Sequence, residues 1–159
     1  MKRFLSLLLL LLTFSILSAQ DCDMCGDWTG TTSGTYGGVR VTSKFYLRCK
    51  KIKESYTVQI KSSHKRYDPE EDRKYDDPIS YWKIELVESG DSSIVFTCPV
   101  NGDLYEYTYK LSLVDNSIEL WEIGIDDIHF DQNGEKHIVK HLSSQPHKVV
   151  TLYKDNDDW

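Results

Sequence analysis

The stretch GVRVTSKFYLR, residues 38–48, decides the fold of this chain because its side chains alternate in character. The apolar positions are Val39, Val41, Phe45 and Leu47. The polar positions between them are Arg40, Thr42, Lys44 and Arg48. A period of two is typical of a strand with one face buried and the other in water. The stretch therefore predicts a half-buried β-strand.

The same period continues along the chain on both sides of this stretch. It predicts further strands over residues 27–33, 53–62, 80–88, 92–99, 103–114, 117–125 and 147–154. Between them lie turns rich in Gly, Asn, Asp and Ser, such as ESGDSS, PVNGD and VDNS. No segment shows a useful helical period. We therefore predict an all-β, antiparallel up-and-down meander of eight strands, either a closed barrel or a sandwich. We favour the closed barrel, because closure leaves no unpaired edge.

The segment IDDIHFDQNGEKHIVKHL, residues 125–142, allows an alternative count of strands. It could form its own hairpin around residues 131–134, which would give ten strands. With either count, the short connections and both termini lie at one end of the barrel. The long connections 63–79 and 126–146 lie at the other end, which is where loops on a rigid scaffold usually carry function.

The apolar faces of these strands would meet inside the barrel. A small eight-stranded barrel can fill its interior with side chains or hold one small ligand. The alternation leaves both possibilities open. If there is a ligand cavity, we expect its lining to include Trp82, Tyr105, Tyr107 and Trp121.

The first residues, MKRFLSLLLLLLTFSILSAQ, have the pattern of an export signal. Lys2 and Arg3 precede an apolar run from Phe4 to Leu17, and small residues offer a cleavage site after Ala19. The run is short for a membrane span, and a polar chain follows it. We predict a signal peptide over 1–19, a single β-barrel domain over 20–159, no membrane span, and a secreted or periplasmic protein.

The charge of the chain limits its partners. Its formal net charge is −6, and loss of the predicted signal would remove two positive charges as well. Such a balance disfavours a nucleic-acid partner, because the phosphate backbone is itself negative.

The four cysteines are expected to form disulfides after export. The predicted register of the first two strands favours a bridge from Cys22 or Cys25 to Cys49 as a structural clasp. Cys98 falls near the opposite end of the barrel. Four cysteines allow three full pairings, and the sequence does not choose among them. A redox motif would need a βαβ context, and a zinc site would need a second close cysteine pair.

The start of the first strand, Gly26-Asp27-Trp28, together with the meander, resembles the lipocalin-like or calycin group of secreted barrels. The resemblance implies a binding protein that holds a small apolar or amphipathic molecule in the barrel lumen. It also implies that Trp28 is a structural plug at the closed end. The basic residue that packs over this Trp in such barrels could only be Lys154 here.

Histidines and carboxylates gather at the end with the long connections. The histidines are His64, His129, His137, His141 and His147. His137 and His141 would share one face of a helix or of a regular strand, so they are the candidate metal ligands. The sequence DQNGE resembles part of a calcium loop but lacks its first and last ligands, which leaves a turn.

No catalytic motif or cofactor signature is present, so we predict a protein that is not an enzyme and needs no cofactor. Two functions remain. The first is a binding protein for a small apolar or amphipathic molecule. The alternative is a filled barrel that binds a protein partner, as an interaction module or inhibitor, through loops 63–79 and 126–146.

Overall fold

The computed structural model describes residues 22–100, 102, 104–142 and 145–155. The predicted signal peptide lies outside these residues. The elements are β1 (Gly26–Tyr36), β2 (Val39–Ile52), β3 (Ser55–Asp68), β4 (Arg73–Asp76), β5 (Ser80–Tyr81), β6 (Glu85–Ser89), β7 (Ser93–Val100), β8 (Tyr105–Val114), β9 (Ser117–Phe130), β10 (Lys136–Leu142) and β11 (His147–Lys154).

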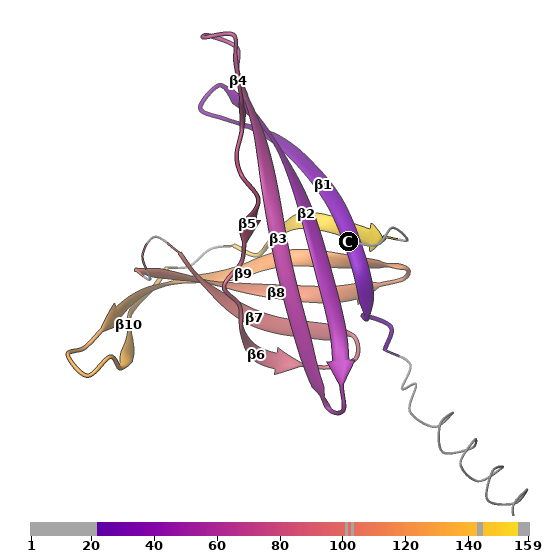
Figure 1. Cartoon of the computed structure of the whole chain (residues 1–159). Coiled ribbons are helices and arrows are strands. Elements are labelled where there is room, and N and C mark those ends of the chain that lie inside the picture. Colours follow the sequence, from indigo (N-terminus) through magenta and orange to yellow (C-terminus); the bar gives the residue numbers. More distant parts are fainter. Residues whose placement is uncertain (1–21, 101, 103, 143–144, 156–159) are drawn as a thin grey trace, which may run out of the picture.

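All eleven strands belong to one antiparallel sheet. Its hydrogen-bonded order is β4-β3-β2-β1-β11-β9-β8-β7-β6, while β10 pairs with β9 and β5 pairs with β3. The sheet folds over on itself, so that β1–β4 form a layer that crosses steeply over the layer of β6–β9 and β11 (Figure 1). The prediction of an all-β antiparallel meander is confirmed.

The prediction of a closed barrel is wrong, because no ladder of hydrogen bonds joins β3 to β6 among the described residues. The segment 80–89 changes partner along its length. Its first residues pair with β3 and its last five pair with β7, and residues 82–84 between them belong to no strand. A closed barrel would need this segment to pair with both neighbours at once, so the sheet stays open along this seam.

The prediction of eight strands, or ten, is also too low. The predicted loop 63–79 contains the end of β3 and all of β4, which pair from Lys65↔Asp76 to Asp68↔Arg73. The predicted loop 126–146 contains the end of β9 and all of β10, as in the ten-strand alternative.

A single hydrophobic core fills the space between the two layers. Its fully buried side chains include Met24, Leu47, Cys49, Ile94, Phe96, Leu111, Ile118 and Leu120. The two layers join where β1 meets β11, at the pairs Trp28↔Lys154 and Thr29↔Tyr153. Gly30 permits this joint, because a Cβ there would lie 2.3 Å from the backbone oxygen of Thr151.

The prediction of a disulfide clasp from Cys22 or Cys25 to Cys49 is wrong, because the disulfide closes a turn within the N-terminal segment. Cys22 bonds to Cys25, with their Cα atoms 5.2 Å apart, and Cys49 is a buried free thiol. The reason is local: the Cys25 N–H donates to the Cys22 carbonyl at 2.9 Å, and this turn brings the two residues within disulfide range. The side chain of Cys49 instead packs in the core.

Trp28 lies at this end of the core, as the resemblance implies. Its ring is buried, and its Nε1 donates to the Met24 carbonyl at 3.0 Å. The ammonium of Lys154 lies 5.4 Å from the ring centroid, which confirms the expected basic residue over the tryptophan. The contact ties β11 to the start of β1.

Candidate functional site

The seam where the sheet stays open is held together at both ends. At one end, Lys61↔Tyr81 and Ser62↔Ser80 pair, and the Trp82 N–H donates to the Ile60 carbonyl at 2.9 Å. At the other end, Asp91 follows β6 and accepts hydrogen bonds from Lys51, at 2.7 Å, and from the Tyr56 hydroxyl. Between these two ties β3 and the segment after β5 separate.

A hollow of about 310 Å³ lies in the separation. We call it the slot; it is lined by Val58, Gln59, Ile60, Lys61, Tyr81, Trp82 and Ile84. Most of the lining is apolar, and Gln59 and Lys61 supply polar groups. The volume lies at the small end of the range for ligand sites, which are typically apolar with a few polar groups.

The edges beside the slot have backbone groups that no neighbouring strand uses. β3 pairs with β2 along one edge, but in the described chain its residues 55–59 have no strand partner on the other edge. β6 is the terminal strand of its layer. An open strand edge offers N–H donors and C=O acceptors to a ligand or to water.

Exposed apolar side chains continue the slot along the seam. Tyr81 is 77% exposed, Val87 is 64% exposed and Leu86 is 42% exposed. Every residue of β6 is exposed, so neither of its faces is covered by the opposite layer. Such a group of apolar residues on a polar surface marks a region of binding more often than scattered single residues do.

Trp82, one of the predicted lining residues, is held in a fixed orientation. Its Nε1 donates to the Oγ of Ser62 at 3.1 Å, and Ser62 is buried. The ring lies edge-on to Phe45, with centroids 6.1 Å apart, and tilted against Tyr109 at 5.0 Å. The slot therefore has a preorganised aromatic wall.

A series of polar side-chain contacts leads away from Trp82. The Oγ of Ser62 lies 3.5 Å from His64 Nε2, and His64 Nδ1 lies 2.8 Å from the Oγ of Ser43. His64 was predicted only as a histidine near the long connections, and neither serine was predicted. The sequence did contain a sign of these contacts, because Ser62 is a small polar residue on the same face as the apolar Val58 and Ile60.

The predicted tyrosines continue the aromatic wall away from the slot. Tyr107 stacks on Tyr109, with centroids 6.0 Å apart, and Tyr109 stacks on Phe96 at 5.5 Å. Burial raises the pKa of Tyr109 far above its usual value, and the nearby Glu122 carboxylate adds to the rise. Tyr105 is half-buried and pairs with Asp127.

The structure does not bring Trp121 to this group. Ile118 and Leu120 are fully buried, so the alternation along β9 places Trp121 on the opposite face. There its Nε1 donates to Glu119 at 3.0 Å, and Glu119 also accepts from Lys148 at 2.9 Å. Of the four predicted lining residues, only Trp82 lies in the slot.

The two candidate metal ligands do not share a face. A β-bulge lies between Ile138 and Lys140, so His137 pairs with His129 whereas His141 pairs with Asp126. Positions 129 and 126 of β9 point to opposite faces. His141 Nδ1 contacts Asp126 at 2.8 Å instead. The expectation of a shared face assumed a regular strand, and the bulge removes it.

His137 does meet other potential ligands at the turn between β9 and β10. Ligand atoms of Asp131, Glu135 and His137 lie within 4.8 Å of one another. The carboxylate of Asp131 already accepts the N–H groups of Asn133 and Glu135 and contacts His137 at 3.4 Å. The backbone N–H of Glu135 contributes most to lowering the pKa of Asp131. These contacts stabilise the turn.

No protein-family model matches this chain, and no curated protein and no solved structure is similar to it at a significant level. Within the described residues, no helix has the length and apolar character that crossing a lipid bilayer requires. Function has to be inferred from the geometry.

Proposed function

We propose that this chain is an exported, non-enzymatic binding protein that holds a small amphipathic molecule in the slot between β3 and residues 81–84. The open seam carries the proposal: the sheet separates there over an apolar floor while both ends of the seam stay tied. The apolar part of the ligand would contact Val58, Ile60 and the Trp82 ring. Its polar end would bind the open edge of β3.

Two features support binding at the slot over binding in a central lumen. Buried side chains occupy the space between the layers. The Trp82 ring is fixed by Ser62 before any ligand arrives, which lowers the entropic cost of binding. The contact of Lys154 with Trp28 supports the lipocalin-like resemblance, which favours a small ligand but not its position.

The alternative function, binding of a protein partner, is supported by the two outer strands. All four residues of β4 are exposed, and β10 is exposed at every position except its last. These strands occupy the segments 63–79 and 126–146 that were predicted to form a working surface. An exposed edge strand can pair with a strand of another chain.

The test measures the binding of decanoate, a single-chain amphipathic anion, to the whole mature protein by isothermal titration calorimetry. Trp82→Ala should weaken binding by about tenfold or more, because it removes a large apolar contact. Trp121→Ala is the matched control, since it removes the same side chain from the opposite face. It should leave the affinity within about twofold of the original.

Trp82 also packs against the core, and its loss could lower the free energy of unfolding by about 3–5 kcal/mol. Ile84→Glu is therefore the second slot variant, since Ile84 is only half-buried and a carboxylate there would repel the probe. Near-UV circular dichroism checks that each variant is folded. The proposal is contradicted if both folded slot variants bind decanoate as tightly as the original protein does. It is also contradicted if the original protein shows no saturable binding.

A further inference from the structure

The outer face of β1, β2 and β3 gathers positive charge in a chain whose net charge is negative. Side chains that share this face are fixed by the pairing of β2 with β3, which runs from Arg40↔Tyr67 to Ile52↔Ser55 without a bulge. On β2 the face carries Arg40, Lys44, Arg48 and Lys50. The neighbouring strands β3 and β4 add Lys61, Lys65 and Lys74.

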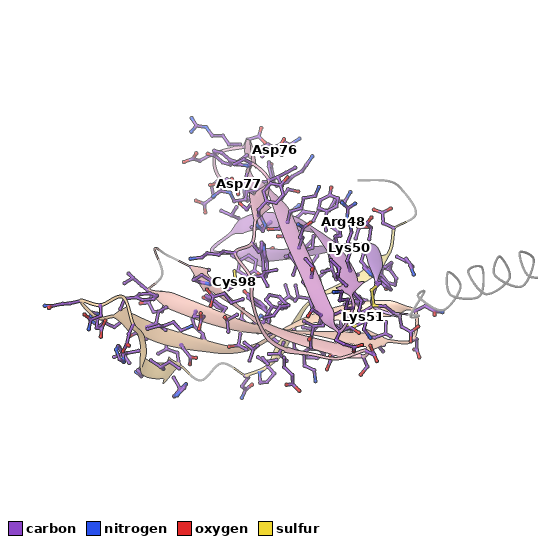
Figure 2. The ribbon with its side chains drawn as sticks, turned by 60° about the horizontal axis from the view of Figure 1, so that its bottom comes forward. Arg48, Lys50, Lys51, Asp76, Asp77 and Cys98 are labelled. Carbon is purple, nitrogen blue, oxygen red and sulfur yellow. A yellow bond between two sulfur atoms is a disulfide. The ribbon has the colours of Figure 1, made fainter. Side chains whose placement is uncertain are left out.

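Few carboxylates balance these seven cations. Asp27 pairs with Arg48, whose guanidinium donates to both carboxylate oxygens at 2.7 and 3.0 Å. Asp76 is the strand-register partner of Lys65, across β3 and β4 at the far end of the face. Figure 2 shows Arg48 and Lys50 together on one part of the layer, with Asp76 at its other end. We call this surface, from β1 to β4, the basic face.

The basic face has a hollow at each end. One, of about 430 Å³, is bordered by Arg40, Lys65, Tyr67 and Lys74. The other, of about 610 Å³, includes Arg48 and Lys50 in its border and reaches the Cys22–Cys25 disulfide. Arg40 and Lys50 lie ten residues apart on β2, so the face extends for roughly 33 Å along the strand.

The uncharged residues of the face identify the kind of anion that suits it. β1 presents a row of hydroxyl groups, Thr29, Thr31, Ser33 and Thr35, opposite the even-numbered positions of β2. The face carries no aliphatic side chain in β1, β2 or β3 from residue 27 to 35, 40 to 50 or 57 to 67. Interfacial membrane binding needs apolar groups that insert between lipids, and protein interfaces have an apolar centre. Ile52 is the one exposed aliphatic side chain in the border of the second hollow, at the end of the face, and a single such side chain forms neither a membrane-inserting group nor an apolar centre.

Tyr46, near the middle of the face, also disfavours single-stranded nucleic acid. The ammonium groups of Lys44 and Lys61 lie 4.6 and 4.9 Å from the centroid of its ring. A base that stacked on this ring would compete with two cations, whereas recognition of single strands relies on open aromatic faces. A sulfate or carboxylate group would approach the two ammonium groups from the edge of the ring.

We propose that the basic face binds a linear acidic polysaccharide, whose sulfate or carboxylate groups pair with the cations and whose hydroxyls meet the β1 row. This site shares Lys61 with the border of the slot, but it does not depend on a ligand bound there. The binding is ionic, so added salt weakens it. Affinity should rise with the length of the saccharide and level off once the extended chain exceeds roughly 33 Å.

The test uses heparin oligosaccharides of defined length and polygalacturonate as probes, at low and at physiological salt. The double variant Lys44→Glu/Lys65→Glu reverses two charges on the basic face. The matched control Lys110→Glu/Lys140→Glu makes the same change in net charge on β8 and β10. We expect the first variant to lose at least tenfold in affinity and the control to stay within about threefold of the original protein.

Duplex DNA and vesicles of phosphatidylglycerol are the competing probes. The proposal is overturned if both variants lose affinity equally, because net charge alone would then account for binding. It is also overturned if DNA or vesicles bind more tightly than both polysaccharides, or if neither polysaccharide binds the original protein. Thermal unfolding of each variant checks that the face is intact.

Discussion

Gly30→Ala tests the joint that holds the two layers of the sheet together. A Cβ at this position would lie 2.3 Å from the Thr151 carbonyl oxygen, whereas ordinary contacts begin near 3.4 Å. β11 would have to move away by about 1 Å. The β1–β11 pairing is short, with two paired positions and the Asp155 N–H donating to the Asp27 carbonyl at 2.7 Å. A shift of this size takes such bonds out of hydrogen-bonding range.

Each lost hydrogen bond costs about 1 kcal/mol, and the altered packing of Val150 and Leu152 adds to this. We therefore expect Gly30→Ala to lower the free energy of unfolding by about 2–4 kcal/mol in urea titrations at equilibrium. Gly124→Ala is the matched control, because a Cβ there would meet Thr108 at an ordinary 3.7 Å. It should be neutral or stabilise by up to about 1 kcal/mol. Equal stabilities for the two variants would refute this account of the joint.

Two further predictions follow from titratable groups. Burial raises the pKa of the Cys49 thiol to about 11, so at pH 8 only roughly one molecule in a thousand carries the reactive thiolate. Iodoacetamide should label Cys49 at least about a hundredfold more slowly in the folded protein than in urea, as followed by mass spectrometry; equal rates would show that the thiol is accessible. The hydrogen bond from Arg48 contributes most to lowering the pKa of Asp27 from its ordinary value of 3.8. The ion pair therefore stabilises the folded state fully above pH 3.8, and this stabilisation is lost as the pH falls through the lowered pKa of the folded state. Asp27→Asn should cost about 1 kcal/mol or less at pH 7, and the difference from the original protein should shrink below pH 4; a difference that persists to pH 2 would exclude the pair as its source.

Alternation within single strands was enough to predict most of the sheet. Phe45 and Leu47 were assigned to the buried face from the period of two, and both are buried. The turns between neighbouring strands were equally readable, because Gly, Asn and Asp mark positions where the backbone reverses. The position of Lys154 over Trp28 followed from the resemblance.

The candidate sites were predicted less well, because they depend on irregularities that no local pattern records. The bulge in β10 separates His137 from His141, and one extra residue is enough to reverse a face. Trp121 was assigned to the interior from its apolar character, but the buried positions of its strand are Ile118 and Leu120. The slot beside Trp82 exists only because two distant strands fail to pair.

The sequence by itself determined most of the strands, the turns between them and much of the core, because these depend on the chemistry of positions a few residues apart. Only the tertiary structure decided that the sheet stays open between β3 and β6, that Cys22 pairs with Cys25, and that cations from three strands form one face. Closure of a sheet depends on how its twist accumulates over all its strands, and a shared face depends on the register between them. Closure and a shared face both depend on many contacts between residues far apart in the sequence, so no single stretch of the sequence determines them.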